Sequence, residues 1–289
     1  MSIAIVTGAS SGLGRAFLDE WKASGEHFDE VWLIARSEDR LKLVAMTLPW
    51  QVRTMALDLA TDEGRAAFAQ ALETARPRVK YLVCSAGYGK IGSVRAIEAH
   101  EQTGMVDLNC TALVDVTQRV LPFVERGGAI FEVASVAAFV PQPAFAVYAA
   151  TKAFVLSFAR ALNVEEKARG IRVVAVCPNP MATSFFDRAG TTPSLFKRPF
   201  FEAPEDVAHA SMRALEKGRD VATNSSMARF IRLATKILPH RLILGAQGVY
   251  FKLKKKIPSL QEKLGIQLVE KGRQAAAFFA YLAQKCGII

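Results

Sequence analysis

Apolar runs alternate with helical patterns through the first 180 residues of the chain. Short continuous apolar runs predict strands at Ile3–Thr7, Val31–Ala35, Val52–Ala56, Val79–Ser85, Ala129–Ala134 and Val173–Cys177. Between them, apolar positions at helical spacing predict helices near 12–24, 38–47, 61–75, 103–125 and 146–169. Strands that are apolar throughout are typical of a parallel sheet covered on both faces. The pattern therefore predicts an α/β fold, a doubly wound (Rossmann-type) parallel β-sheet with helices on both faces.

Candidate functional residues follow several of these strands. Gly8, Asp58, Gly87, Ser135 and Pro178 each stand at or just past the end of a predicted strand. In doubly wound sheets, ligands bind outside the carboxyl ends of the strands. We therefore expect these residues to share one site.

A glycine-rich turn joins the first strand to the first helix. Gly8, Gly12 and Gly14 form the pattern G-x-x-x-G-x-G within the segment Thr7–Gly14. Such glycines allow a tight turn and a close approach of the backbone to a pyrophosphate, which then meets the helix N-terminus. The pattern predicts a dinucleotide site, and a turn without a ligand is the alternative.

The end of the second strand indicates which dinucleotide binds. An acidic residue near this end usually contacts the ribose 2′-hydroxyl of NAD, whereas an Arg accommodates the 2′-phosphate of NADP. Here Ala35 is uncharged, Arg36 follows it, and Arg40 comes one helical turn later. This favours NADP(H) over NAD(H), and a solvated Arg36 at a helix surface is the alternative.

Ser135, Tyr148 and Lys152 form the main candidate for chemistry. Tyr148 and Lys152 are four residues apart and lie on the same face of a predicted helix. An ammonium held beside a phenol favours the phenolate, which makes the tyrosine a usable acid and base near neutral pH. The same spacing recurs at Tyr250 with Lys254 and at Tyr281 with Lys285. Only the first pair has a serine thirteen residues before its tyrosine, so the prediction rests on Ser135, together with Asn109 and the glycine-rich turn, and not on the Tyr and Lys spacing alone.

Together these motifs resemble the short-chain dehydrogenases/reductases in their single-domain form, from Ile3 to about Thr183. The resemblance implies a catalytic set of Asn109, Ser135, Tyr148 and Lys152. In this set Tyr148 exchanges the proton with the substrate, and Ser135 orients the substrate oxygen. Lys152 stabilises the phenolate of Tyr148 and hydrogen-bonds the nicotinamide ribose, and Asn109 anchors a water that links Lys152 to solvent. It also implies cofactor contacts by Gly8, Ser10, Ser11, Gly12, Leu13, Gly14, Arg36, Asp58, Leu59, Ala86, Gly87, Tyr148, Lys152, Pro178 and Thr183.

The chain departs from the family pattern at two positions. Ser85 stands where the family usually has an Asn associated with sheet stability. Asn179 replaces a Gly beside the nicotinamide. Asn tolerates positive φ better than most residues, so we expect the turn to persist. We also expect the Asn179 side chain to narrow or polarise the substrate pocket.

The segment after Thr183 is rich in phenylalanine and predicts a mobile apolar lid at about 184–203. The residues expected to touch substrate are Val136, Phe145, Asn179, Phe185 and Phe186. They favour a hydrophobic ketone or secondary alcohol, such as a hydroxysteroid, a bile acid or a lipophilic carbonyl compound. A 3-oxoacyl-type reductase is the alternative enzyme. A catalytically idle NADP-binding sensor, or a membrane-surface protein, is the alternative of another class. The phenylalanines alternatively pack on the body or at a subunit contact.

The net positive charge of the chain lies in its C-terminal part. The whole chain has a net charge of +10, and residues 224–289 hold 12 of its 37 Lys and Arg but only two of its 27 acidic residues. We divide the chain into a catalytic domain at 1–223 and a basic helical C-terminal extension at 224–289, packed on the same domain. Residues 227–238 form an amphipathic pattern with Arg229, Arg232 and Lys236 on one side. Three interpretations stay open: contact with an anionic membrane surface, an acidic partner, or packing and oligomer contact.

Other function classes lack support in the sequence. The four cysteines and four histidines are dispersed, which argues against a metal site. No run is long and apolar enough to span a membrane, and no signal peptide precedes the first strand. No nucleic-acid-reading motif accompanies the charge. We expect a cytoplasmic homodimer or homotetramer, with peripheral membrane association as the alternative location.

Overall fold

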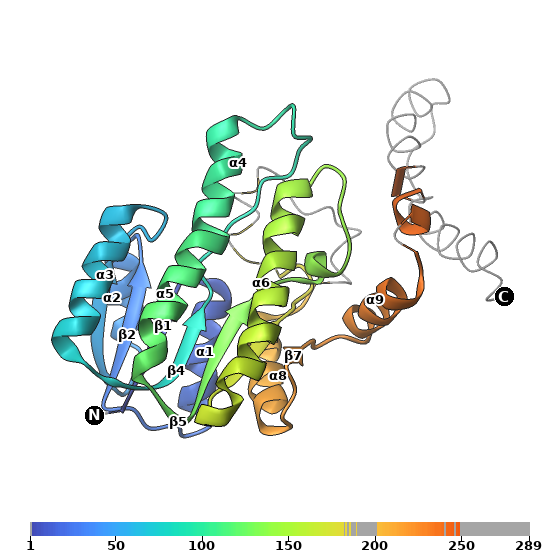
Figure 1. The fold of residues 1–289 in the computed structure, drawn as a ribbon. Coiled ribbons are helices and arrows are strands. Elements are labelled where there is room, and N and C mark those ends of the chain that lie inside the picture. Colours follow the sequence, from blue (N-terminus) through green and yellow to red (C-terminus); the bar gives the residue numbers. More distant parts are fainter. Residues whose placement is uncertain are drawn as a thin grey trace, which may run out of the picture.

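A computed structural model describes residues 2–181, 183, 185, 189, 201–239, 241–245, 247 and 248. Within these residues seven parallel strands form one sheet in the order β3-β2-β1-β4-β5-β6-β7 (Figure 1). The strands are β1 (Ser2–Thr7), β2 (Glu30–Ala35), β3 (Gln51–Ala56), β4 (Arg78–Cys84), β5 (Val124–Val133), β6 (Arg172–Val176) and β7 (Val221–Ala222). The strand order reverses between β1 and β4, where doubly wound sheets bind their ligands. The predicted fold class is confirmed.

Helices cover both faces of the sheet. Successive strand residues point to opposite sides, and because these residues are apolar on both sides, both faces must be buried. On one face Ile5, Trp32 and Ile130 pack under α3 (Asp62–Ala75), α5 (Ala112–Val120) and α6 (Ala146–Glu165). On the other face alternate residues such as Val6 and Phe131 pack under α1 (Gly12–Ala23), α2 (Glu38–Ala45) and α8 (Pro204–Glu216). Burial on both sides explains why the strands are apolar throughout.

The helix predicted near 103–125 consists of several parts. It comprises α4 (Ala99–Val106), a π-helical turn η1 (Asp107–Thr111), α5, and a 3₁₀ turn η2 (Leu121–Phe123). The π turn contains Asn109, in keeping with the frequent occurrence of such turns at functional sites. The pattern also missed β7, since a strand of two residues is too short for an alternation to be detected.

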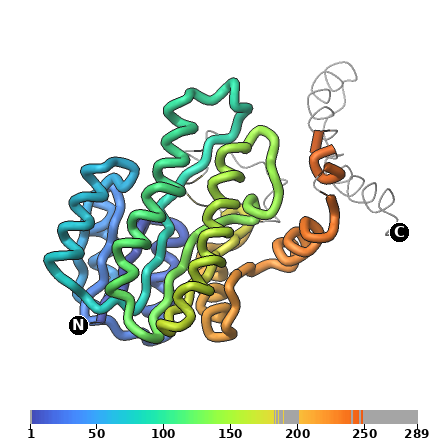
Figure 2. Tube along the Cα trace, viewed as in Figure 1, coloured from blue at the N-terminus to red at the C-terminus, as the bar shows by residue number. Residues whose placement is uncertain are grey.

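Helix α9 (Ser226–Ile237) confirms the helical pattern at 227–238. It begins beyond β7, its N-cap is Ser225, and it projects from the β7 side of the body (Figures 1 and 2). Within the described residues no helix is long and apolar enough to cross a membrane. All of the predicted lid except residues 185, 189 and 201–203, and residues 249–289 of the extension, lie outside the described residues.

Candidate active site

The carboxyl ends of β1 to β6 surround one cavity of about 590 Å³, a volume typical of small-molecule sites. The predicted residues that line it are Gly8, Ser10, Ser11, Gly12, Leu13, Arg36, Asp58, Leu59, Ala86, Gly87, Ser135, Tyr148, Lys152, Pro178 and Thr183. Gly14 and Asn109 are not among the lining residues. The structure therefore brings the predicted cofactor and catalytic groups to one edge of the sheet.

The glycine-rich turn is packed too tightly for side chains at two positions. Gly8 has φ of +67°, and a Cβ there would lie 2.8 Å from the backbone nitrogen of Ala86. A Cβ at Gly14 would lie 2.5 Å from the carbonyl oxygen of Gly8. Gly14 therefore allows α1 to approach the turn and does not line the cavity. A turn built this closely leaves its backbone accessible to a pyrophosphate.

The segment after β6 lies over the same turn. Gly12 has φ of +57°, and a Cβ there would lie 3.4 Å from Cγ2 of Thr183. Thr7 connects the turn to β4, because its hydroxyl oxygen accepts a hydrogen bond of 3.1 Å from the backbone nitrogen of Ala86. The two halves of the sheet thus meet around the predicted pyrophosphate position.

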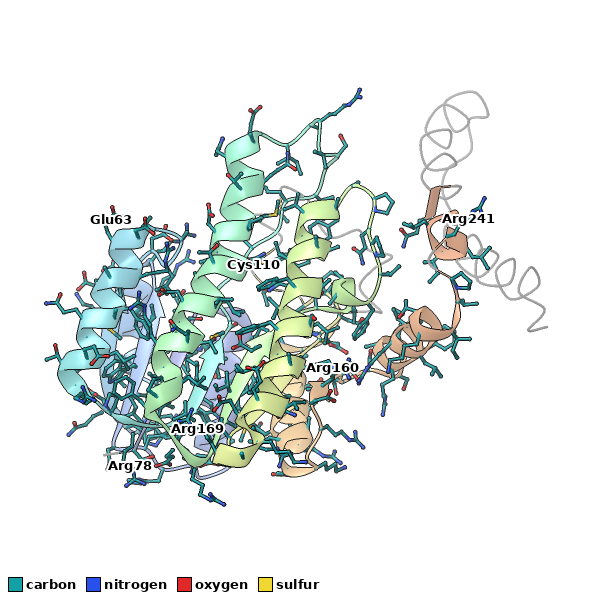
Figure 3. The ribbon with its side chains drawn as sticks, in the orientation of Figure 1. Glu63, Arg78, Cys110, Arg160, Arg169 and Arg241 are labelled. Carbon is teal, nitrogen blue, oxygen red and sulfur yellow. The ribbon has the colours of Figure 1, made fainter. Side chains whose placement is uncertain are left out.

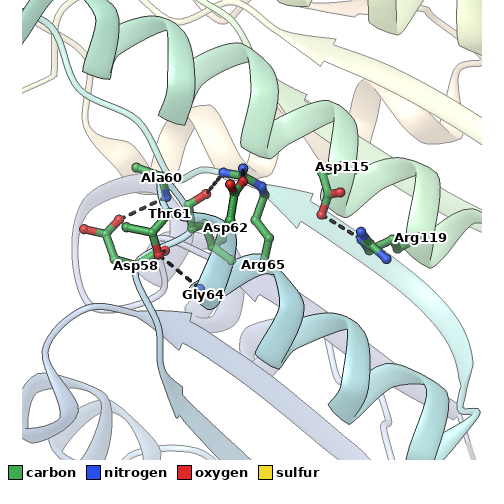
Figure 4. A network of polar contacts seen from close by, with 9 residues as sticks. Asp58, Ala60, Thr61, Asp62, Gly64, Arg65, Asp115 and Arg119 are labelled. Atoms are coloured by element: carbon green, nitrogen blue, oxygen red, sulfur yellow. Dashed lines mark hydrogen bonds and ion pairs between the residues drawn. The ribbon is translucent and has the colours of Figure 1, made fainter. Parts of the chain in front are cut away.

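Asp58, which lines the cavity, is held in place by the start of α3 (Figure 4). Its Oδ1 accepts a hydrogen bond of 3.0 Å from the backbone nitrogen of Ala60. Thr61 caps α3 by accepting a hydrogen bond of 3.0 Å from the backbone nitrogen of Gly64. A Cβ at Gly64 would lie 2.0 Å from the Asp58 carbonyl oxygen, so glycine permits this close turn. Arg36 and Arg40 line the cavity beyond the end of β2.

Ser135, Tyr148 and Lys152 are all more than nine-tenths buried. Ser135 caps the 3₁₀ turn η3 (Val136–Phe139), since its Oγ accepts a hydrogen bond of 3.1 Å from the backbone nitrogen of Ala137. Lys152 Nζ lies 5.8 Å from the centroid of the Tyr148 ring and donates a hydrogen bond of 2.7 Å to the carbonyl oxygen of Val133. The three predicted side chains therefore converge on the end of β5.

Burial dominates the electrostatics of these groups. It raises the pKa of Tyr148 to about 12, against the effect of a hydrogen bond with Ser135. It lowers the pKa of Lys152 to about 8, against the effects of Cys110 and Glu132. The lowered Tyr148 pKa that the sequence suggested is not found here, because burial of the phenol outweighs its hydrogen bond with Ser135. Stabilisation of a phenolate by Lys152 stays a prediction.

Asn109 does not line the cavity and contributes to the site through hydrogen bonds to neighbouring residues. Its Nδ2 donates hydrogen bonds to the carbonyl oxygen of Tyr88 at 2.9 Å and to Thr151 Oγ1 at 3.1 Å. Its Oδ1 accepts a hydrogen bond of 3.0 Å from the Tyr88 backbone nitrogen. Cys110, labelled in Figure 3, lies on the same turn, and its Sγ contacts the Thr151 carbonyl. The π turn thus fixes both the loop after β4 and the helix that carries Lys152, and the water predicted at Asn109 stays untested.

An apolar wall stands beside Tyr148. The Phe145 ring stacks on the Tyr148 ring at 4.2 Å with an interplanar angle of 20°. Phe185 lies on another side, with ring centroids 5.5 Å apart. Both residues and Val136 line the cavity, and their contact with a substrate stays a prediction. Phe186 lies outside the described residues.

Asn179 lines the cavity, but a hydrogen-bond network holds its side chain. Its Nδ2 donates to Ser225 Oγ at 2.6 Å, and its backbone nitrogen donates to Glu202 Oε2 at 2.9 Å. Among the described non-glycine residues, positive φ occurs only at Arg76 and Ala144. The expectation that the turn at Asn179 persists because Asn tolerates positive φ is therefore wrong, since Asn179 does not have positive φ. The network replaces that explanation, and no sequence signal pointed to Glu202 or Ser225.

Glu132 is a second residue that the sequence did not single out. It is fully buried on β5, and its Oε1 accepts a hydrogen bond of 2.8 Å from the Thr117 hydroxyl. Its Oε2 has no hydrogen-bond partner within the part of the chain that is described. Burial raises its pKa to about 7, against the effects of Thr117, Cys84 and Lys152. The one signal in the sequence that could have pointed to Glu132 is that it is a single acidic residue within an otherwise apolar strand segment.

The fold and the site together define an oxidoreductase of the class that uses a nicotinamide cofactor. The family model for short chain dehydrogenases matches residues 2–193, and the chain therefore belongs to the short-chain dehydrogenase/reductase family. Among the described residues, no group of three or more His, Cys, Asp and Glu side chains is placed to hold a metal ion.

Relatives and solved structures agree with this assignment. Sulfoacetaldehyde reductase 2 of Chromohalobacter salexigens is 35% identical over 192 residues, covering 63% of this chain and 74% of the relative. The very-long-chain 3-oxoacyl-CoA reductase of Rattus norvegicus is 31% identical over 190 residues, covering 62% of this chain and 59% of the relative. A short-chain dehydrogenase from Sphingobium yanoikuyae in complex with NADPH superposes with a TM-score of 0.71 at 30% identity, over 81% of this chain and 92% of that chain. A short-chain dehydrogenase/reductase from Burkholderia phymatum in complex with NAD superposes with a TM-score of 0.70 at 22% identity, over 81% of this chain and 93% of that chain. At this identity the likeness shows the fold alone.

Proposed function

We propose that this protein is an NADP(H)-dependent oxidoreductase that interconverts a ketone and a secondary alcohol on a hydrophobic substrate. The observation that carries the proposal is the position of Tyr148. It lies in the same cavity as the glycine-rich turn, beside Ser135 and Lys152 and against the Phe145 ring.

The residues present fit a dinucleotide, because glycines occupy the positions where a Cβ would close the turn. When bound, the nicotinamide supplies or accepts the hydride. Tyr148 donates its hydroxyl proton to the developing alkoxide in reduction and accepts it in oxidation. At a pKa of about 12 it is protonated at neutral pH, which suits the donor role. Ser135 orients the substrate oxygen, and Lys152 supplies positive charge behind the phenol.

The preference for NADP(H) rests on Arg36 and Arg40. Both line the cavity at the end of β2, where a 2′-phosphate would lie. Ala35 ends the strand without a carboxylate that could take the ribose hydroxyl of NAD. Two guanidinium groups beside an uncharged strand end favour the phosphorylated cofactor.

The preference for a hydrophobic substrate rests on the wall around Tyr148. Val136, Phe145 and Phe185 supply apolar surface. Among the described lining residues the cations are Arg36, Arg40 and Lys152. We assign the two arginines to the cofactor and Lys152 to catalysis, so no described cation is left for an anionic substrate such as sulfoacetaldehyde.

A 3-oxoacyl-type reductase is the second candidate. The relative named for that activity matches this chain at 31% identity, and the apolar wall would accept an acyl chain as readily as a ring system. A catalytically idle sensor is disfavoured, because such a protein has no need of the buried Ser135, Tyr148 and Lys152 together.

The test uses the full chain with NADPH or NADH and a panel of steroid, bile-acid, acyl and short polar ketones. We expect NADPH oxidation with at least one bulky apolar ketone and none with sulfoacetaldehyde. The Tyr148→Phe variant should lose turnover while still binding NADPH, as measured by cofactor fluorescence. Wild-type activity in that variant would remove Tyr148 from the mechanism. Binding of NADPH without turnover of any ketone would favour the sensor.

A further inference from the structure

A second cavity of about 440 Å³ lies apart from the catalytic one and shares no described lining residue with it. Its walls come from the end of α8, from β7 and from the start of α9. Five of its lining residues are cations: Arg213, Lys217, Arg219, Arg229 and Arg232. Thr223 and Asn224 add a hydroxyl and an amide. Such a lining matches the donors that recognise phosphate oxygens.

No carboxylate lines this cavity in the part of the chain that the structure describes. Asp220, which precedes β7, is close enough for its charge to interact with Arg232. Its carboxylate is already paired with Arg160 on α6 at 2.7 Å. Like charges gathered without counter-charges repel one another, so an external anion would stabilise the cluster.

Helix α9 has three different faces, and one of them lines the cavity. Ala228 is fully buried and faces the body. Arg229 and Arg232 line the cavity from one flank. Phe230 and Ile237 lie opposite Ala228 at the helical period of 3.6 residues, with Leu233 beside them. Their exposed fractions are 59% for Phe230, 58% for Leu233 and 70% for Ile237.

The outward apolar face lies on the segment that projects from the body (Figures 1 and 2). Arg241, just past α9 on the same projecting segment, adds a further exposed cation (Figure 3). Residues 221–248 contain no Asp or Glu at all. An apolar ridge on a helix whose charged residues are all cations is the pattern of helices that lie in the interface of an anionic membrane.

We propose that α9 and the adjoining cationic cavity form a docking surface for an anionic phospholipid membrane. The arginines and Lys217 bind lipid phosphates, while Phe230, Leu233 and Ile237 enter the boundary between headgroups and acyl chains. A soluble phosphate compound would occupy the cavity but leave the apolar face in water. A nucleic acid would likewise use the charges and not the phenylalanine and leucine. A membrane is the partner that uses both features.

The experiment measures co-sedimentation of the full chain with vesicles at two salt concentrations. One set contains phosphatidylcholine alone, and in the other about a third of the lipid is phosphatidylserine. We expect binding to the second set only, and weaker binding at the higher salt concentration. Arg229→Gln with Arg232→Gln should weaken vesicle binding about 30-fold, and Phe230→Ser with Leu233→Ser should weaken it about tenfold or more.

The controls remove an equal charge elsewhere and, in a separate variant, one exposed apolar side chain elsewhere. Lys42→Gln with Arg76→Gln and, separately, Leu43→Ser change exposed side chains outside this surface and should leave vesicle binding unchanged. Unchanged NADPH binding in every variant shows that the body is intact. Vesicle binding that the α9 variants do not weaken would overturn the proposal. So would binding of inorganic phosphate without vesicle binding, or loss of a dimer in the α9 variants without vesicle binding.

Discussion

The side-chain amide of Asn179 donates a hydrogen bond of 2.6 Å to the hydroxyl of Ser225. Asn179 lines the catalytic cavity, and Ser225 is the N-cap of α9. The buried Glu202 accepts hydrogen bonds from the backbone nitrogens of both residues, each at 2.9 Å. The wall of the active site and the start of the projecting helix are therefore held by one polar network.

We expect Asn179 and Ser225 to act as a unit in stability. Asn179→Ala removes a donor to Ser225, and Ser225→Ala also removes the cap of α9, so each should lower the free energy of unfolding by about 1–2 kcal/mol. The double variant should lose less than the sum of the two, by about 0.5 kcal/mol or more. Chemical denaturation of the four proteins measures this coupling. Strictly additive losses would show that the 2.6 Å hydrogen bond contributes nothing.

Gly89 should be sensitive to the smallest added side chain. A Cβ there would lie 2.7 Å from Cδ2 of Tyr148 and 3.0 Å from the Phe145 ring. Gly89→Ala should therefore displace the Tyr148 ring and lower kcat about 10- to 100-fold, since catalysis depends on the placement of the reacting groups. NADPH binding should change much less. Gly92→Ala is the control in the same loop, because its Cβ would meet only the Ile97 side chain, at 3.0 Å from Cγ1, and no catalytic group. Equal effects of the two variants would contradict the prediction.

The sequence predicted the sheet well because burial on both faces produces unbroken apolar runs, and it predicted the cavity because strand ends share one edge. It could not predict the Asn179 network, since Glu202 and Ser225 are far from Asn179 along the chain. It missed the π turn at Asn109, because one extra residue in a helical turn barely changes an apolar periodicity. No sequence signal pointed to Gly89, for another reason: the Phe145 and Tyr148 rings that its Cβ would meet stand at the start of α6, far from Gly89 along the chain.

Glu132 should set the alkaline limit of activity through Lys152. The carboxylate of Glu132 raises the pKa of Lys152, whereas burial lowers that pKa to about 8. We expect kcat/KM for NADPH in ketone reduction to fall as the pH rises through about 8, because Lys152 loses its charge. Glu132→Gln removes the carboxylate and should move this fall to lower pH. Glu125→Gln, on the same strand but only partly buried and paired with Arg78, is the control and should leave the profile unchanged. An unshifted profile in Glu132→Gln would show that the two groups are not coupled.

Glu132 should also make stability depend on pH. Its pKa in the folded protein is about 7 against an ordinary value of 4.5, so the folded state holds the proton more tightly. Stability is therefore highest below pH 4.5 for this group and is lost as the pH rises through about 7. Glu132→Gln, which cannot ionise, should be more stable than the wild type at pH 8 by up to about 3 kcal/mol. The gain should shrink towards pH 5 in denaturant titrations at both pH values. A gain independent of pH would mean that Glu132 does not titrate in this range.

Arg36 should determine cofactor choice. Because a charge-assisted hydrogen bond to phosphate contributes about 1.5–3 kcal/mol, Arg36→Ala should raise KM for NADPH about 10- to 100-fold. KM for NADH should change little, since that cofactor lacks the 2′-phosphate. Arg40→Ala should also raise KM for NADPH if both guanidinium groups reach the phosphate. Arg15→Ala is the control, because Arg15 is a partly exposed arginine on α1 that does not line the cavity. Parallel losses for the two cofactors in Arg36→Ala would show that Arg36 supports the fold of the site and does not read the phosphate.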